Sequence, residues 1–155
     1  MTIEDLKSLM DNFDPAKLLP DLESLAGNLA ALLRIAVMVG PVVLLVIGLL
    51  YLFASPKEAN YHFGYRCYFG MGSVEAWRFT QRLAGMVWGG LGLILTVVML
   101  VLSGGFAGME TVDMVWRAAK CVAWQAGCTV VSVIAVNTVV AMNFDSKGAY
   151  RRKND

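Results

Sequence analysis

The sequence predicts an all-α, polytopic membrane protein with three transmembrane helices. Hydrophobic residues make up 57% of the chain and charged residues 16%, against roughly 45–50% and about 25% in soluble domains. The mean hydropathy is +0.60. The apolar residues gather in three uncharged runs, and each run has the roughly 20 residues that a helix needs to cross the ~30 Å hydrocarbon core of a bilayer. Because backbone groups inside that core must be hydrogen-bonded within the segment, we expect all three runs to be helical.

The three runs define a membrane domain with a short segment at each end. We expect the domain to cover residues 31–144, with spans at 35–54, 83–102 and 121–142. Gly40-Pro41 inside the first span should kink it, because proline removes one backbone hydrogen bond. Arg34 at the mouth of this span either extends to the lipid headgroups or pairs with an acid of the N-terminal segment.

Residues 1–30 form an acidic segment ahead of the first span. Six acidic and two basic side chains fall within residues 1–28. Apolar residues recur at helical spacing from Ile3 to Phe13, and Asp14-Pro15 has the pattern of an N-cap followed by proline at the first helical position. We interpret the segment as one or two short amphipathic helices at the membrane surface, the alternative being a partly ordered leader. We do not expect a secretory signal, which begins basic and then becomes apolar.

Small and polar residues in the second and third spans predict close helix packing. Gly85, Gly89 and Gly92 lie on one stripe of the second span, and Gln125 and Asn137 are the amides of the third. Small residues let helix backbones approach in a membrane, and amides hydrogen-bond between helices. The partner of the glycine stripe is either in this chain or in another copy, so a homo-oligomer is one expectation. A position on a substrate path is the alternative for the two amides.

The distribution of charge predicts the orientation in the membrane. The central loop, residues 55–82, carries four basic residues against two acidic ones, and the C-terminal tail, residues 145–155, is also basic and is expected to fray. Basic segments favour the cytoplasmic side of a membrane. We therefore expect a multi-pass protein of the cytoplasmic membrane, with its N-terminus outside and its C-terminus inside.

The central loop divides into two parts at Ser73. Ser73 is a good N-cap, so a helix should begin there and continue into the second span. Trp77, Arg78 and Arg82 then either anchor this helix at the membrane interface or bind a partner. Arg66, in the glycine- and aromatic-rich part before Ser73, either ties the loop to the helices by stacking or receives a carboxylate or a lipid phosphate.

The residue pattern predicts no catalytic, cofactor or metal site. His62 and Cys67 lack a third ligand or a base at a plausible spacing. No glycine-rich phosphate loop precedes a helix, and no basic stretch with interleaved aromatics indicates nucleic acid. We expect a protein without enzymatic activity, whose partners are membrane lipids and other proteins.

The central loop resembles that of the SdpI family of bacterial membrane proteins. That family has a span, then a loop with a Pro, an Asn and a Gly-hydrophobic-Arg-Thr core, then a Trp at a helix start, a stretch with Asn or His, a Gly and two further spans. Cys67 stands where the family has Thr, and Gln81 near where it has Asn or His. The resemblance covers residues 43–144, and the matching residues are Pro56, Asn60, Gly64-Tyr65-Arg66, Trp77, Arg82 and Gly85.

The resemblance implies a protein that gives immunity to a secreted peptide toxin and passes a signal by drawing a transcriptional repressor to the membrane. One alternative is an accessory subunit of a larger membrane complex such as a transporter. Another is a small oligomeric channel or transporter, with a path lined by Gln125, Thr129 and Ser132. The candidate partner-binding residues are Pro56, Asn60, Gly64, Tyr65, Arg66, Trp77, Arg78 and Arg82.

Overall fold

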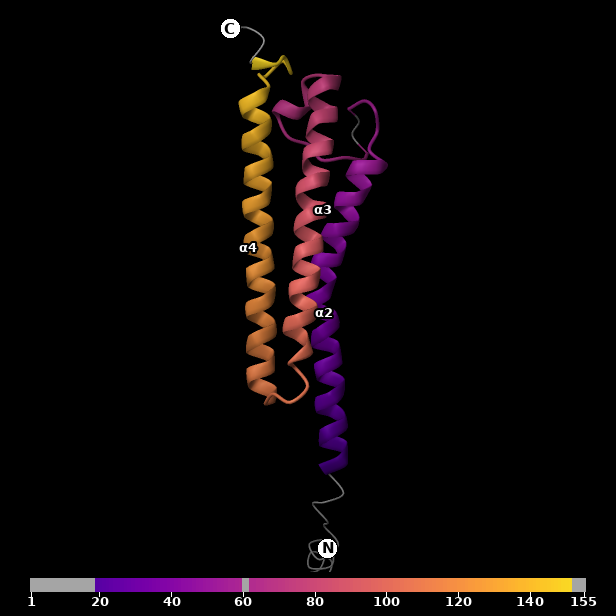
Figure 1. Ribbon diagram of the computed structural model, residues 1–155, viewed down its shortest axis with the longest axis vertical. Helices are drawn as coiled ribbons and strands as arrows, with labels where there is room; N and C mark the ends of the chain where they lie inside the picture. The colour runs from indigo at the N-terminus through magenta and orange to yellow at the C-terminus, as the bar shows by residue number, and fades with distance from the viewer. Residues whose placement is uncertain (1–18, 60–61, 152–155) are drawn as a thin grey trace, which may run out of the picture.

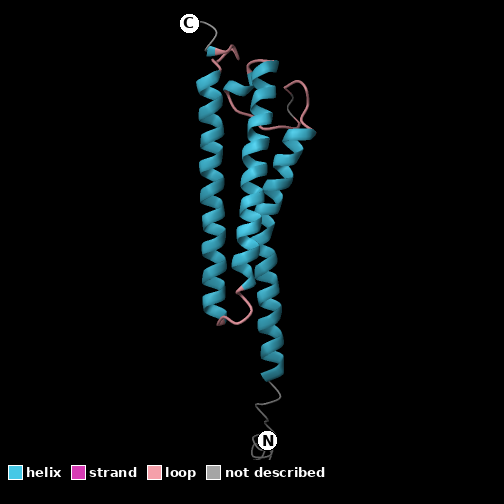
Figure 2. Cartoon of the chain, in the orientation of Figure 1, coloured by secondary structure: helices cyan, strands magenta, loops and turns pink. Residues whose placement is uncertain are grey.

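The structure, a computed structural model, describes residues 19–59 and 62–151. Three long helices lie side by side in an elongated bundle (Figure 1). All regular elements of the described residues are helical, and loops join them at the two ends (Figure 2). In chain order the elements are α2 (Leu19–Phe53), the short 3-10 helix η2 (Phe69–Met71), α3 (Val74–Gly104) and α4 (Thr111–Asn143).

Each long helix is apolar and long enough to cross a membrane. The candidate spans are Gly27–Phe53, Val74–Gly104 and Thr111–Asn143. Only 17% to 28% of the most apolar window of each helix is buried inside the protein. Most of their apolar surface therefore faces outward, as it does in helices that contact lipid rather than water. The predicted all-α protein with three transmembrane helices is confirmed.

The first helix begins before the expected boundary of the membrane domain. α2 starts at Leu19 and continues without interruption past residue 31. Pro20 is compatible with this start, because proline fits the first turn of a helix, where its missing N–H has no partner anyway. Ala30 is 6% exposed and belongs to a core cluster with Phe106 and Met114. Residues 19–30 thus belong to the same helix as the first span, and residues 1–18 of the predicted surface segment lie outside the described residues.

The glycine stripe of α3 packs against α2 of the same chain. A Cβ added at Gly85 would lie 2.9 Å from the backbone nitrogen of Leu52, and one added at Gly92 would lie 2.9 Å from the Cβ of Leu45. A Cβ added at Gly48 of α2 would lie 2.5 Å from the Cα of Gly89. These gaps leave no space for a side chain, so the two backbones are in direct contact. The partner of the stripe is therefore intramolecular.

The predicted kink in α2 and the predicted side-chain hydrogen bond of Gln125 occur at the same place. Pro41 lies inside α2 and has no N–H, so the carbonyl of Val37 four residues earlier has no partner in its own helix. Gln125 of α4 donates from Nε2 to that oxygen at 2.9 Å. Gly40 provides the space, because a Cβ there would lie 2.8 Å from Oε1 of Gln125. α2 changes direction along its length (Figure 1).

Candidate functional site

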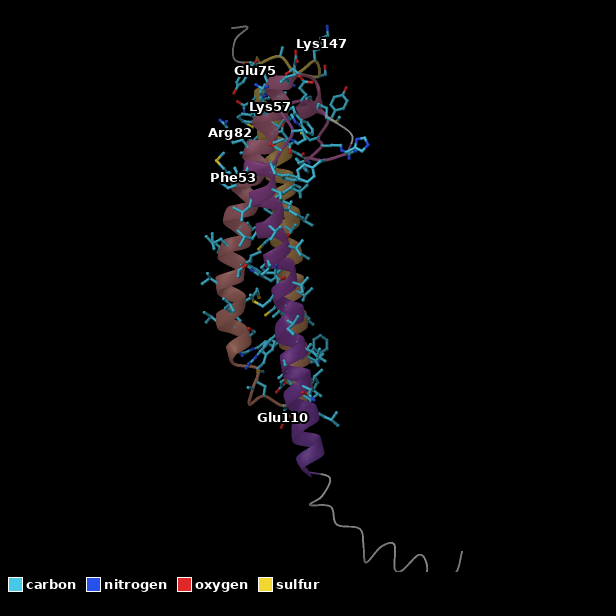
Figure 3. The ribbon with its side chains drawn as sticks, turned by 90° about the vertical axis from the view of Figure 1, so that its right-hand side faces the viewer. Phe53, Lys57, Glu75, Arg82, Glu110 and Lys147 are labelled. Carbon is cyan, nitrogen blue, oxygen red and sulfur yellow. The ribbon has the colours of Figure 1, made fainter. Side chains whose placement is uncertain are left out.

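The candidate residues gather at one end of the bundle, which we call the loop end. It comprises residues 54–73, residues 144–151 and residues 74–82 of α3. Figure 3 shows Lys57, Glu75 and Lys147 together at this end, whereas Glu110 marks the opposite end. Asn60, one of the candidate residues, lies outside the described residues.

The start of α3 is joined to the C-terminal residues. As predicted, Ser73 is the N-cap, and its Oγ accepts a hydrogen bond from the N–H of Ala76 at 3.1 Å. The same hydroxyl donates to the carbonyl of Gly148 at 2.7 Å. Gly148 has a φ of +74°, and a Cβ there would lie 2.5 Å from the carbonyl carbon of Gly72. One serine therefore starts a helix and fastens the end of the chain to it.

Residues 144–151 form a compact turn instead of a frayed tail. The carboxylate of Asp145 accepts hydrogen bonds from the N–H groups of Lys147 and Ala149 at 2.9 and 2.8 Å. The rings of Phe144 and Tyr150 lie 4.5 Å apart, with Phe144 fully buried. Arg151 donates from Nε to the carbonyl of Phe144 at 3.1 Å. The expected fraying does not reach these residues, because a side-chain turn and an aromatic pair fix them.

Trp77 is fully buried and holds the first part of the loop. Its Nε1 donates to the carbonyl of Pro56 at 2.9 Å, and its side chain is 0% exposed. Gly64, with a φ of +118°, lies against the indole, since a Cβ there would be 2.6 Å from two ring carbons. The alternative in which Trp77 is an interfacial anchor is therefore wrong. The indole instead brings three of the candidate residues into contact.

Gln81, one turn after Trp77, binds the backbone of Tyr65 in both directions. Its Oε1 accepts from the N–H of Tyr65 at 2.8 Å, and its Nε2 donates to the Tyr65 carbonyl at 2.7 Å. The side chain is 1% exposed, so both bonds are protected from water. Sequence reasoning noted Gln81 only as a departure from the family pattern. Its position four residues after Trp77, on the same helix face, was the available signal.

The side chain of Tyr65 connects the loop to α3 and α4, and Trp88 in turn contacts α2. Its hydroxyl donates to Oδ1 of Asn137 at 2.7 Å, and its ring meets the Trp88 indole edge-to-face with centroids 4.8 Å apart. Tyr51 of α2 lies 5.6 Å from the same indole, whose Nε1 donates to Ser132 at 3.1 Å. Asn137 is predicted from the sequence to hydrogen-bond another helix, but its partner here is the loop residue Tyr65.

The environment of Tyr65 favours the neutral hydroxyl. Burial raises the pKa of Tyr65, and the nearby Cys67 and Tyr51 add to this. The net shift is upward from the ordinary value of 10.0. The hydroxyl is therefore a stable donor to Asn137 at neutral pH.

The outer surface of the loop end is basic. Arg78 is exposed and donates from Nε to the carbonyl of Lys57 at 3.0 Å, so it fixes the loop while presenting its charge. Arg66 is exposed beside a groove of about 400 Å³, which also contains Phe69 and Asn137. Among the described residues here, two exposed acidic side chains, Glu58 and Glu75, stand against six exposed basic ones: Lys57, Arg66, Arg78, Arg82, Lys147 and Arg151.

The polar stripe of α4 is used inside the bundle. Gln125 and Ser132 are buried, and their hydrogen bonds go to Val37 of α2 and to Trp88 and Thr129. These hydrogen bonds join helices of one chain. In the part of the chain that the structure describes, no group of three or more His, Cys, Asp or Glu could hold a metal ion.

The three apolar helices and the fastened loop define a multi-pass integral membrane protein. The model of the SdpI/YfhL protein family matches residues 57–143, a stretch that begins in the loop and continues through α3 and α4. The chain belongs to this family. No curated protein and no solved structure was found to match the chain.

Proposed function

We propose that the protein acts by binding another protein at the loop end, in an SdpI-like role in toxin immunity or membrane signalling. The observation that carries this is a loop held in one conformation whose outer surface is exposed. Trp77 and Gln81 bind the loop backbone from inside. Outside, Tyr68 is 76% exposed, and Arg66, two residues earlier in the sequence, is also exposed. Aromatic and arginine side chains on a preorganised surface are the usual anchors of protein interfaces.

We further propose that the loop end faces the cytoplasm of a bacterium. Both basic segments of the chain, the central loop and the C-terminal residues, meet at this end through Ser73 and Gly148. The excess of exposed basic side chains there agrees with the tendency of such segments to stay on the cytoplasmic side. A partner such as a transcriptional repressor would meet this surface.

The proposed role involves binding and no chemical step. It is supported by what the buried polar side chains of the described residues do. Thr80 hydrogen-bonds its own helix, whereas Gln81, Gln125 and Ser132 hydrogen-bond other segments. These hydrogen bonds stabilise the fold.

A killing assay tests immunity. A strain sensitive to the secreted peptide toxin against which SdpI-type proteins protect would express the wild type, Arg66→Ala, Tyr68→Ala, or the control Val101→Ala, whose side chain is 74% exposed on a span. We expect survival with the wild type and the control, and loss of survival with the two loop variants at equal membrane levels. Unchanged killing with the wild type present would rule out immunity.

An accessory role in a larger membrane complex is the second candidate, and one residue favours it. Trp124 is 66% exposed, and it lies 13 residues after Thr111, about 20 Å along α4. Tryptophan prefers the ends of a span and protein interfaces to its lipid-facing middle. Mild-detergent purification followed by mass spectrometry separates the two candidates. A stoichiometric unrelated membrane protein that is lost with Trp124→Leu would favour the accessory role.

A further inference from the structure

Arg34 lies at the opposite end of the bundle, beside the C-terminus of α3. It donates from Nε to the carbonyl of Ser103 at 3.0 Å and from Nη2 to the carbonyl of Gly104 at 3.2 Å. The last carbonyls of a helix have no partner within it, and the negative end of the helix dipole favours a cation there. α3 has no basic residue in its last turn, so α2 provides the charge.

Among the described residues, no carboxylate neutralises the charge of Arg34. Its hydrogen-bond partners there are the carbonyls of Ser103 and Gly104. Residues 25–40 of α2 contain no acid. A second guanidinium lies nearby, because a Cβ added at Gly105 would be 3.4 Å from Nη1 of Arg117. The acids at this end, Glu110 and Asp113, are exposed. Arg34 is therefore a cation at the end of α3 whose hydrogen-bond partners, among the described residues, are neutral carbonyls.

An apolar groove of about 440 Å³ opens beside Arg34 between α2 and α3. Its only charged lining residue is Arg34 itself, and Ser103 and Gly104 complete that end. Its walls are hydrocarbon, formed by Ile35, Met38, Val39, Val42 and Leu100. A groove with one cation at its end and apolar walls along its length matches an amphipathic anion.

The depth of Arg34 is that of a lipid phosphate. Its partner Ser103 lies 21 residues after Arg82 in α3, a rise of about 32 Å along the helix. This rise equals the ~30 Å thickness of the hydrocarbon core. Arg82 is exposed near the loop end (Figure 3). The separation of the two arginines along α3 therefore matches two opposite boundaries between hydrocarbon and headgroups.

We propose that this groove binds one anionic phospholipid, with the phosphate on Arg34 and an acyl chain along Val39 and Leu100. A guanidinium has five N–H donors, and two of them are used by the end of α3. The remaining three can bind phosphate oxygens. A zwitterionic headgroup would place its ammonium near two guanidinium groups. The site should therefore prefer phosphatidylglycerol to phosphatidylethanolamine, and it is independent of partner binding at the loop end.

Native mass spectrometry of the purified full chain with each added lipid tests the proposal. We expect the wild type to retain phosphatidylglycerol about tenfold better than phosphatidylethanolamine, the ratio expected for one charge-assisted hydrogen bond. Arg34→Gln should abolish the preference. Val39→Trp should lower retention of phosphatidylglycerol, because it fills the groove without touching the bonds of Arg34. Lys120→Gln, the same charge change at an exposed site on α4, should leave both unchanged.

Equal retention of the two lipids by the wild type would overturn the proposal. So would retention by Val39→Trp equal to that of the wild type. If Arg34→Gln fails to fold because the end of α3 loses its cation, Val39→Trp decides the question alone. Loss of retention in Lys120→Gln as large as in Arg34→Gln would mean that total charge governs binding, and would also reject the site.

Discussion

Gln125 of α4 donates a hydrogen bond to the carbonyl of Val37 in α2, at 2.9 Å, and so replaces the donor that Pro41 lacks. The proline would otherwise leave a buried carbonyl without a partner in a span. The bond also holds α4 against α2. This helps because α4 contacts α2 over a smaller surface than α3 does. A second substitution, at Pro41, should therefore restore the stability that is lost when Gln125 is replaced.

Gln125→Leu should lower the free energy of unfolding by about 1–2 kcal/mol, because a carbonyl in a membrane span loses its donor. Pro41→Ala restores a backbone N–H, so the double variant should recover most of that loss. Thermal denaturation in detergent would measure both, with Thr138→Val as the control because Thr138 is exposed and bonds only its own helix. A double variant less stable than Gln125→Leu would contradict the interpretation.

Gly85→Val should separate α2 from α3. The added atoms would meet the backbone of Leu52, which cannot move as a flexible side chain can. We expect a loss of about 1–3 kcal/mol in the free energy of unfolding, measured by tryptophan fluorescence in detergent. Gly90→Ala is the matched control, since no atom lies within 4 Å of a Cβ there. Equal stability of the two variants would show that the glycine contact is unimportant.

Gln81→Leu should loosen the loop without melting the helices. It removes both hydrogen bonds to the backbone of Tyr65, leaving a buried N–H and carbonyl unpaired. We expect residues 62–72 to exchange amide hydrogens about tenfold faster or more, with α3 and α4 unchanged, as measured by hydrogen exchange. Arg82→Gln, an exposed neighbour, is the control. Unchanged protection in Gln81→Leu would argue that other contacts hold the loop.

Tyr65 should make stability depend on alkaline pH. Its pKa is higher in the folded protein than the ordinary value of 10.0, so the folded state holds the proton more tightly than the unfolded state. The contribution is fully present below pH 10.0 and is lost as pH rises from there through the folded pKa. Denaturation of the wild type and Tyr65→Phe across this range would measure it as a difference. Parallel profiles would count against it.

Prediction from sequence succeeded where the signal is local. Ser73 caps the helix that follows it, and the glycines of α3 and Gln125 do pack helices. It failed where a residue's surroundings come from distant segments. The residues next to Trp77 in the sequence are typical of an interfacial anchor, yet contacts with Pro56 and Gly64 bury its side chain. Residues 145–151 likewise have the composition of a basic tail, yet the carbonyl of Gly148 accepts a hydrogen bond from Ser73.

The sequence by itself determined the class of protein, the three spans and the membership of the loop in a known pattern. Hydropathy and helix capping depend on neighbours a few residues away, so they can be read along the chain. Only the tertiary structure decided which polar groups meet. Gln81 and Tyr65 are 16 residues apart, and Arg34 and Ser103 are 69 apart. Such bonds depend on how the helices are oriented against one another, and no local pattern records that orientation.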